Sequence, residues 1–384
     1  MILGFNLTAD ETALVGLAKG FAKNHIRPRA ADWEKSRTMP REALREAARL
    51  GLIYLDAAAP GKAPISFAAK LLVLEALSKE DFGFAFSLTN TQGMASRLAN
   101  SGTPSQKQRF LADLQSTERL SATCLSEPGA GSDLSGITTT ATKTDGGWML
   151  NGTKGWITNA AEADVFLVYA QTDSAKGWRG IGSYLVDGQQ SGFDRQPAYS
   201  LMGGHSIGVG GFKLTDMFVA DEDVIAPPGE AFKSAMVSVN SARTYVAGMI
   251  NAMVHSSLSH AVTYGNERQA FGKTLLENQG LSWSLADVAN KLEASRLLTY
   301  KAARLVDAGE DAMMAAAHAK KFAGDFGGTA IAACIQAMGA HGMESKLPLS
   351  RHLMCAKLAC YTDGSTEMQN ERIAGKLVEV YGND

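Results

Sequence analysis

Hydrophobic residues recur at helical spacing through the first third of the chain. Leu14, Leu17 and Phe21 share one face of a segment that starts with the capping-box sequence Thr8-Ala9-Asp10-Glu11. A second capping box, Thr103-Pro104-Ser105-Gln106, opens a later helix. Two segments between them are rich in Ala, Leu and Glu and are also predicted to be helical: 41–50 and 67–79. The pattern therefore predicts an all-helical first domain over residues 1–121.

The middle of the chain consists of short apolar runs separated by turn residues. Trp148-Met149-Leu150 lies between the turn sequences Asp145-Gly146-Gly147 and Asn151-Gly152. Two further runs, 165–169 and 184–186, are typical of strands because they are rich in Val, Tyr and Phe. Residues 122–228 are therefore predicted to form a β-domain.

Helical spacing returns after Pro227-Pro228-Gly229. Leu285, Val288 and Leu292 recur on one face, and the pattern continues to Val306. Ala-rich segments at 315–323 and 330–337 predict closely packed helices. Residues 229–384 form a second helical domain in this interpretation, and the fold class is α+β.

Composition and charge exclude several classes of protein. The 384 residues are 45% hydrophobic and 20% charged, with a formal net charge of -2, which is typical of a globular protein and does not indicate a nucleic-acid partner. No run of about 18 apolar residues predicts a membrane span. The four cysteines lack C-x-x-C spacing, so we expect no metal site and no disulfide framework. Because residues 1–5 also lack the features of a signal peptide, we expect a cytoplasmic protein without a membrane partner.

Five segments carry candidate chemistry, although each alone also has an ordinary structural interpretation. The glycine-rich stretch Leu125–Asp133 can approach a bound group or be a simple loop. Lys154–Asn159 offers a Trp next to a hydroxyl group for binding, but this Trp can also be an ordinary core residue of a sheet. The Arg of Asn266–Lys273 can hold a pyrophosphate or end a helix, and Gln336–Gly342 can be a helix C-cap. Tyr361–Gln369 is either a helix N-cap or a catalytic loop.

Together, and in this order, the five segments resemble those of the acyl-CoA dehydrogenase family of flavoproteins. The resemblance covers nearly the whole chain, including Ile26-Arg27-Pro28 and Leu50-Gly51-Leu52. It implies an N-terminal helical domain, a middle β-domain and a C-terminal four-helix bundle. It also implies FAD-dependent α,β-dehydrogenation of an acyl thioester, with an electron-transfer flavoprotein as acceptor and a homodimer or homotetramer as the assembly.

The resemblance assigns site residues position by position. Its FAD contacts fall on Leu125, Ser126, Ser132, Trp156, Thr158, Arg268, Phe271, Gln279, Gln336, Gly339, Ser365 and Glu367. The contacts expected to serve the cofactor of the neighbouring subunit are Arg268, Phe271, Gln279, Gln336 and Gly339. The acyl thioester and its carrier arm are expected at Ser132, Asn240, Arg243 and Gly364.

The family's catalytic base is normally the Glu of Y-E-G-T, and this chain has Thr362-Asp363-Gly364-Ser365 instead. A second branch of the family places its Glu at the position that Ala242 occupies here, so Asp363 is the base that the resemblance supports. In the family the backbone N–H of the base residue also contacts the thioester oxygen. Asp is shorter than Glu by about 1.5 Å, which indicates a closer substrate or a displaced backbone.

Two further positions depart from the family pattern. The second glycine of Q-x-x-G-G-x-G is Ala340, and the M-G-x-R-x-S-x-T segment is Met202–Val209, with His205 in place of the Arg. We therefore expect the contacts of that Arg, and of the Ser and Thr that follow it, to be absent. The surroundings of the acyl group or carrier arm are expected to be atypical.

Three alternatives remain open from the sequence. The carrier is CoA or an acyl-carrier protein, since Thr91–Ala95 and Gly364–Met368 look like relatives from secondary-metabolite pathways. A second function is a flavin oxidase of another carbon acid, as in the nitroalkane oxidases of this superfamily, which use an Asp base. A third is a non-catalytic binding protein like the DNA-binding alkylation-response relatives, but these carry a basic domain and this chain shows no basic run.

Overall fold

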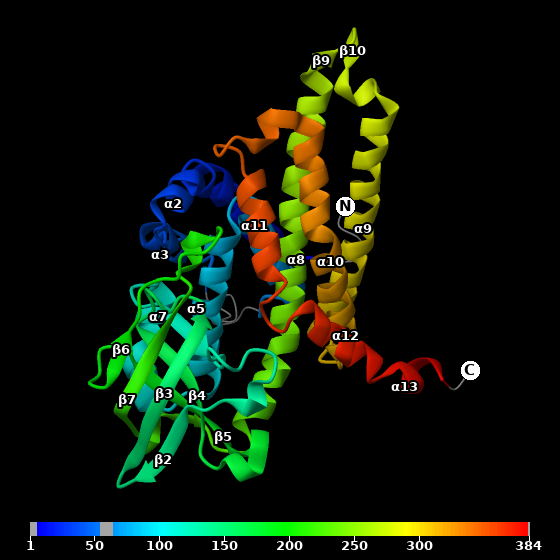
Figure 1. Cartoon of the computed structure of the whole chain (residues 1–384). Coiled ribbons are helices and arrows are strands. Elements are labelled where there is room, and N and C mark those ends of the chain that lie inside the picture. Colours follow the sequence, from blue (N-terminus) through cyan, green and yellow to red (C-terminus); the bar gives the residue numbers. More distant parts are fainter. Residues whose placement is uncertain (1–5, 54–63, 383–384) are drawn as a thin grey trace.

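The computed structural model describes residues 6–53 and 64–382, and its elements follow the order helical, β, helical (Figure 1). Residues 1–5, where we expected no signal peptide, lie outside this range. The first helical region has these elements: α1 (Ala9–Phe21), α2 (Ala30–Ser36), α3 (Arg41–Arg49), α4 (Phe67–Ser78), α5 (Phe82–Ser101), α6 (Pro104–Gln106) and α7 (Ala112–Ser116). Both predicted capping boxes are confirmed, because Thr8 pairs with Glu11 and Thr103 with Gln106.

Helix α4 is buried on nearly every side, and polar groups from distant parts of the chain satisfy its first turn. Ser66 accepts from the Ala69 N–H at 3.2 Å, while the Asp307 carboxylate accepts from the N–H groups of Phe67 and Ala68. These N–H groups have no partner inside the helix. The cap therefore joins the N-terminal helices to the C-terminal ones.

The middle of the chain forms a mixed sheet. Its strands are β1 (Ser121–Cys124), β2 (Thr140–Thr144), β3 (Gly147–Ile157), β4 (Val165–Gln171), β5 (Ile181–Asp187), β6 (Phe193–Arg195), β7 (Gly210–Ala220) and β8 (Val224–Ala226). The order is β6-β7-β3-β2-β4-β5-β8, with β1 parallel to β4. The two halves of the sheet meet at one parallel pair, Thr140 and Gln171. Phe166, Tyr184 and Phe212 are fully buried in the core of this domain.

The predicted turn at Asn151-Gly152 is wrong. These residues lie inside β3, where the register with β7 shifts between Leu150 and Gly152. A Cβ atom on Gly152 would lie within 2.7 Å of Thr139, so only glycine allows this bulge to pass the neighbouring strand. Strand β3 therefore runs on to Ile157 and carries Trp156 to its end.

Long helices make up the last part of the chain. They are α8 (Ala231–Glu267), α9 (Gln279–Asp307), α10 (Met313–Met338) and α11 (Leu349–Ala359), followed by α12 (Thr366–Ala374) and α13 (Leu377–Tyr381). The hairpin of β9 (Gln269–Ala270) and β10 (Lys273–Thr274) joins α8 to α9 at the tip of the molecule (Figure 1). The two Ala-rich segments belong to the single helix α10, which continues through Gly324, Gly327 and Gly328 between them.

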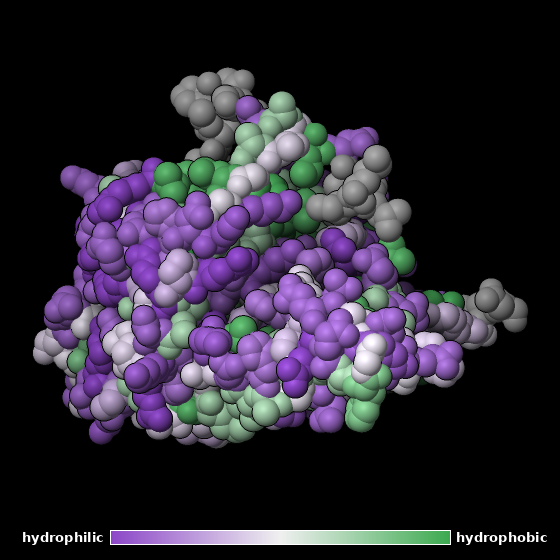
Figure 2. Space-filling model, turned by 90° about the horizontal axis from the view of Figure 1, so that it is seen from above, coloured by the Kyte–Doolittle hydropathy of each residue, from purple (hydrophilic) through white to green (hydrophobic). Residues whose placement is uncertain are grey.

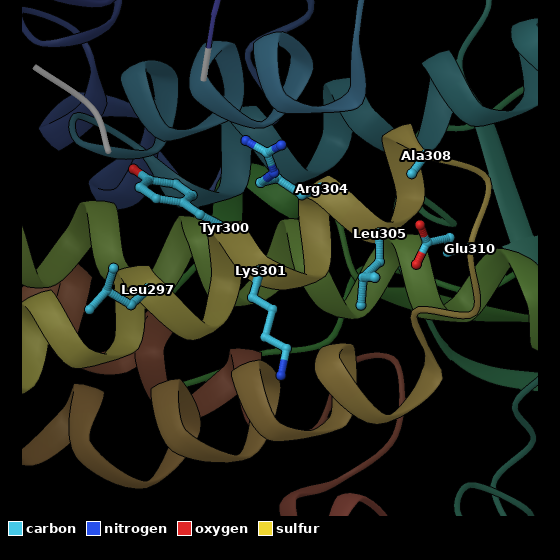
Figure 3. A pocket seen from close by; sticks show the side chains of 7 residues that line it. All are labelled: Leu297, Tyr300, Lys301, Arg304, Leu305, Ala308 and Glu310. Carbon is cyan, nitrogen blue, oxygen red and sulfur yellow. The ribbon is translucent and has the colours of Figure 1, made fainter. Parts of the chain in front are cut away.

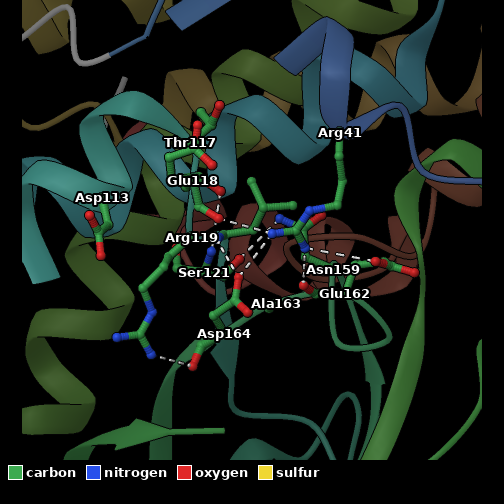
Figure 4. A network of polar contacts seen from close by, with 12 residues as sticks. Arg41, Asp113, Thr117, Glu118, Arg119, Ser121, Asn159, Glu162, Ala163 and Asp164 are labelled. Atoms are coloured by element: carbon green, nitrogen blue, oxygen red, sulfur yellow. Dashed lines mark hydrogen bonds and ion pairs between the residues drawn. The ribbon is translucent and has the colours of Figure 1, made fainter. Parts of the chain in front are cut away.

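A polar network fixes the sheet to the first helical region (Figure 4). Arg41 of α3 donates to the carbonyl oxygens of Glu162 and Glu118 and to the Asp164 carboxylate. The Asp164 carboxylate also accepts from the Leu120 N–H, one residue before β1. The buried Asn159 side chain donates to the carbonyl oxygen of Ser121 at 3.0 Å. These contacts hold the start of β1, which leads into the glycine-rich segment 125–133, and the residues that follow β3, whose end carries the segment 154–159.

Within the described residues, no helix combines the length and apolar character needed to cross a membrane.

Candidate active site

Asp363 lies in the short turn between α11 and α12, and its backbone is in the left-handed region with a φ of 54°. The N-cap of α12 is Ser365, whose Oγ accepts from the Met368 N–H at 3.4 Å. Ser365 is therefore the residue that caps α12, and Asp363 is not part of this cap. A non-glycine residue with this φ is strained, and such strain clusters at functional sites.

Arg243 on α8 holds the backbone of Asp363. Its Nε donates to the Asp363 carbonyl oxygen at 3.0 Å, and its Nη1 donates to Asn240 Oδ1 at 3.0 Å. Arg243 is 2% exposed, and burial, reinforced by the charge of Arg372, lowers its pKa to about 10. The structure therefore brings together Asp363, Arg243 and Asn240, as the sequence predicted.

Gly364 completes this turn with a φ of 91°. Its carbonyl oxygen accepts from Gln369 Nε2 at 3.0 Å. A Cβ atom at this position would lie 3.0 Å from Gln369 Nε2 and 3.4 Å from Arg243 Nη2. Glycine is therefore required both by the backbone conformation and by the space that these two side chains leave.

The Asp363 carboxylate accepts no hydrogen bond from any described residue. Burial raises the pKa of this carboxyl, and the charges of Lys320 and Arg243 oppose the rise. Lys320 was not among the predicted site residues. Its signal in the sequence is a lysine inside the Ala-rich segment 315–323, which the helical period places on the buried face of α10.

A buried ion pair shapes the glycine-rich loop of the β-domain. Lys154 Nζ lies 2.9 Å from Glu127 Oε1 and donates to the Leu125 carbonyl oxygen at 3.0 Å. Burial alone would raise the pKa of Glu127. The charge of Lys154 and the hydrogen bonds from Thr139 and Thr138 outweigh burial and hold this pKa at about 2. The sequence contained both residues in its motifs but did not predict their pairing, since 26 residues lie between them.

Trp156 and Thr158 lie at the end of β3, next to this loop. The Gly155 N–H donates to the Ser126 carbonyl oxygen at 3.3 Å, which joins the two segments. Trp156 is 61% exposed with a φ of 61°, and the Tyr199 ring lies 4.8 Å away, edge-on. Ser126 and Thr158 are half-buried and Ser132 is exposed. The loop therefore presents hydroxyl groups beside an exposed aromatic ring.

Helix α8 connects this loop with Asp363. Phe232 and Met236 pack on the apolar cluster that contains Leu125. Met236, Asn240 and Arg243 follow at helical spacing on the same face. Arg243 therefore lies about 10 Å along the helix from the contacts with the β-domain. Both groups of predicted residues border one face of α8.

The remaining predicted cofactor residues lie elsewhere. Arg268 is 25 residues beyond Arg243 on α8, which is about 37 Å along the helix, and Phe271 and Gln279 follow at the hairpin. Gln336 and Gly339 end α10 at the same tip, where Tyr264 stacks on His341 at 4.8 Å. The chain does not bring these five residues near its own Asp363.

The surface at this tip is suited to further contacts. Seen from that end, green hydrophobic patches interrupt a mainly hydrophilic surface (Figure 2). Exposed large hydrophobic residues of the tip and of the adjoining helix ends are Val262, Phe271, Trp283 and Met343, and Phe271 is 97% exposed. Such an exposed aromatic ring is unusual for a surface that faces only water.

His205, at the position of the family Arg, pairs with an acidic residue of the first helical region. Its Nδ1 lies 2.8 Å from Glu34 Oε1, and the Glu34 carboxylate also accepts from the N–H groups of Gly204 and His205. The following Ser206 donates to Asp81 at 2.7 Å. The imidazole therefore contacts the acidic residue on α2, and the absence of the contacts that the family Arg makes stays a prediction.

Two surface pockets lie on the C-terminal helices, one far from the predicted site residues and one beside the turn that carries Asp363. One of about 440 Å³ runs along the last turns of α9, from Leu297 to Glu310, and contains no predicted site residue (Figure 3). A second of about 310 Å³ lies over the start of α12 and includes the predicted Glu367 with Tyr361 and Lys357. A backbone hydrogen bond at the start of α12 and a hydrogen bond with the Ser365 side chain lower the pKa of Glu367. This carboxylate therefore stays anionic.

Comparisons with known proteins agree with this arrangement. Family models for the acyl-CoA dehydrogenase N-terminal, middle and C-terminal domains match residues 8–118, 122–217 and 229–378. A short-chain-specific acyl-CoA dehydrogenase of Megasphaera elsdenii is 32% identical over 385 residues, covering 98% of this chain and 100% of the relative. 

Solved structures give the same result. The butyryl-CoA dehydrogenase of Megasphaera elsdenii has a TM-score of 0.92 at 31% identity, covering 98% of this chain and 100% of that one. PigA, solved with FAD and proline, has a TM-score of 0.90 at 26% identity, covering 98% and 99%. By sequence and by fold, this chain belongs to the acyl-CoA dehydrogenase family.

Proposed function

We propose that this chain dehydrogenates an acyl thioester between its α and β carbons, with Asp363 as the base. The observation that carries this proposal is a half-buried carboxylate without a hydrogen-bond partner in the described chain. It lies on a turn whose backbone Arg243 holds, on the face of α8 that leads to the Ser126 loop. A base needs a free oxygen and a pKa above that of an ordinary Asp, and burial provides the second.

FAD fits the residues of the β-domain face. An exposed indole at Trp156 can lie along a flat ring system, and the hydroxyls of Ser126 and Thr158 offer hydrogen bonds at its edge. The exposed Arg268 suits a pyrophosphate, which a guanidinium binds in a bidentate manner. We assign the other predicted FAD contacts to Leu125, Ser132, Phe271, Gln279, Gln336, Gly339, Ser365 and Glu367.

The roles of the residues follow from their positions. The Asp363 carboxylate takes the proton from the α carbon, and bound FAD supplies the acceptor for the hydride that leaves the β carbon. The Asp363 N–H donates to the thioester oxygen, where negative charge develops. Arg243 and Gly364 fix the turn so that carboxylate and N–H face the same point, and Asn240 orients Arg243. Ser132 at the loop surface contacts the carrier arm.

We extend the proposal to organisation and partners. Boundaries at 121/122 and 228/229 are supported by the matched family ranges and by the start of α8 at Ala231. The separation of Arg268 from Asp363 supports a homodimer or homotetramer. All four cysteines are free thiols, which fits the reducing cytoplasm. The electron acceptor is an electron-transfer flavoprotein, and slow oxygen consumption during turnover is expected because the function is dehydrogenation.

The test replaces Asp363 by Asn in the FAD-loaded enzyme. Anaerobic flavin reduction by a short acyl-CoA, and by the same acyl group on a carrier protein, identifies the carrier. With the better substrate, Asp363→Asn should still perturb the flavin spectrum but reduce its flavin at least about 10²-fold more slowly, since general-base contributions begin there. The control is Asp287→Asn, which changes an exposed carboxylate on α9. Reduction of Asp363→Asn at the wild-type rate would contradict the proposal, and rapid peroxide formation would favour an oxidase.

A further inference from the structure

Lys320 is a buried lysine on the face of α10 that packs against the turn carrying Asp363. It is 1% exposed, and the neighbouring residues on its helix face are Ala316 and Ala323. An ammonium group in such surroundings is unfavourable unless a charge or acceptor compensates it. Something near its Nζ therefore has to offset the loss of water.

The hydrogen-bond partner of Lys320 lies just before Asp363. Its Nζ donates to the Cys360 carbonyl oxygen at 3.4 Å, and Cys360 is the C-cap residue of α11. One turn further along α10, the Cβ position of Gly324 faces Thr366 Oγ1 at 3.4 Å and Cys360 Sγ at 3.6 Å. Helix α10 thus touches the turn on both sides of Asp363. A single hydrogen bond of this length leaves most of the lysine charge uncompensated.

The Asp363 carboxylate is the opposite charge that acts most strongly on Lys320. Burial lowers the pKa of Lys320 to about 8, and Asp363 is the largest influence that opposes this fall. In return, burial raises the pKa of Asp363 and the charge of Lys320 lowers it. The lowering by Lys320 is larger than that by Arg243. Arg243 already directs Nε and Nη1 to the Asp363 carbonyl oxygen and to Asn240.

The other charged groups around this turn are engaged elsewhere or act indirectly. From α12, the charge of Arg372 acts on Arg243 and lowers its pKa. From α11, Lys357 lies over the Tyr361 ring at 5.1 Å. The exposed Glu367 in the first turn of α12 is acted on by Lys357 and Lys321. Of the two cations that act on the Asp363 carboxyl, Lys320 therefore has the larger influence.

We propose that Lys320 is a positioning residue for the base: its ammonium group keeps the half-buried Asp363 carboxylate ionised while its hydrogen bond holds the turn. The inference rests on the proposed function, in which Asp363 takes the α proton. The proton acceptor must be ionised before the reaction, so a group that stabilises the carboxylate sets the lowest pH at which the enzyme works.

The experiment separates the charge of Lys320 from its hydrogen bond. Lys320→Gln keeps a donor for the Cys360 carbonyl oxygen and removes the charge, Lys320→Met removes both, and Lys320→Arg keeps both. The control is Lys321→Gln, since the neighbouring Lys321 pairs with Asp325 at the surface. The rate of anaerobic flavin reduction by excess thioester is measured against pH for each FAD-loaded enzyme.

In Lys320→Gln and Lys320→Met the acid limb of the profile should move up by about one pH unit or more, because an opposite charge within a few ångströms lowers a carboxyl pKa by that amount. Below this limb both variants should react about tenfold more slowly than the wild type. Lys320→Arg and Lys321→Gln should keep the wild-type limb. Lys320→Met provides the same readout if Lys320→Gln does not bind FAD, since an apolar side chain suits the pocket.

An unmoved acid limb in the neutral variants would overturn the inference, because a purely structural role is preserved by Gln. This result is distinct from failure of the proposed function. If Asp363→Asn reduces its flavin normally, the base assignment itself is wrong. If Asp363→Asn is slow and Lys320→Gln has the wild-type limb, only the role of Lys320 is wrong.

Discussion

At the scale of single residues, the backbone of Asp363 favours the shorter acid. Its φ of 54° lies in the left-handed region, which Asp and Asn occupy far more readily than other non-glycine residues. The side chain of Glu would extend the carboxylate by about 1.5 Å into the space of the substrate. The departure from the family Glu and the unusual backbone are therefore linked.

We accordingly predict that Asp363→Glu slows flavin reduction instead of restoring a family-like rate. A displacement of this size costs on the order of 10²-fold in rate. Stopped-flow reduction with the preferred thioester measures the effect, and the flavin spectrum shows whether the cofactor site is intact. A variant faster than the wild type would mean that the site is not built around Asp.

Glu75 on α4 is a second residue whose environment is unusual. Its Oε1 is buried without a partner, while Oε2 accepts from the Tyr300 hydroxyl at 3.1 Å. Burial raises its pKa from 4.5 to about 7, although the charge of Arg296 opposes this. The unfolded chain therefore releases this proton at lower pH than the folded chain does.

The sign of the pH effect follows directly. Between pH 4.5 and 7 the folded state binds more protons at Glu75, so the free energy of unfolding falls as pH rises, by up to about 3 kcal/mol. Glu75→Gln should remove this fall and be more stable than the wild type at pH 8. Urea unfolding at pH 5 and pH 8 measures it, with exposed Glu379→Gln as control. Equal pH dependence in Glu75→Gln and wild type would refute it.

At the scale of elements, the loop between β1 and β2 depends on one side chain of β3. Lys154 is fully buried and holds both the Glu127 carboxylate and the Leu125 carbonyl oxygen. Glu127 in turn accepts from the N–H groups of Thr138 and Thr139, at the far end of the loop. The ion pair therefore closes the loop that presents Ser126 and Ser132.

Lys154→Met should destabilise the chain by about 3–5 kcal/mol, because it leaves Glu127 as an unpaired buried charge. FAD affinity should fall with it, since the loop loses its fixed shape. Lys143→Met on β2 is the matched control: this exposed lysine pairs with Asp221, and its loss should change stability by less than about 1 kcal/mol. Urea unfolding and FAD titration measure both quantities. Equal behaviour of the two variants would show that the pair does not shape the loop.

At the scale of the whole molecule, α8 separates two parts of one predicted cofactor site. Asp363 and the Ser126 loop border its first turns, and Arg268 lies at its far end, about 37 Å beyond Arg243. One FAD molecule near Asp363 cannot also contact Arg268 of the same rigid helix at that distance. A second copy of the chain, with its hairpin on the first copy's site, resolves this geometry.

Subunit complementation tests this arrangement. Arg268→Gln and Asp363→Asn should each be nearly inactive alone. Co-expressed, they should recover roughly a quarter of wild-type activity after random pairing, because a mixed dimer contains one site with neither change. Two Asp363→Asn copies carrying different tags are the control and should stay inactive. If the mixed enzyme is as inactive as its parents although mixed dimers are isolated, Arg268 does not serve the neighbouring site.

The sequence by itself determined the elements and the chemistry available to them. Capping boxes at Thr8 and Thr103, helical periods and turn residues act over a few residues, so local sequence specifies them. The order helical, β, helical followed from the same signals, whereas Asp363, Arg243 and the Ser126 loop were chosen because five motifs resemble those of the family. The bulge at Gly152 was missed because the reason for it, the close approach of Thr139, lies on another strand.

Tertiary structure alone decided which of these groups meet. Lys320 and Asp363 are 43 residues apart in the chain, Glu127 and Lys154 are 27, and His205 finds Glu34 across 171 residues. No local pattern encodes such pairs, because burial and electrostatic interaction depend on distances through space, whereas sequence motifs record distances along the chain. The distance between Arg268 and Asp363 of the same chain was also missed for this reason. It depends on α8 being one continuous helix, which only the tertiary structure shows.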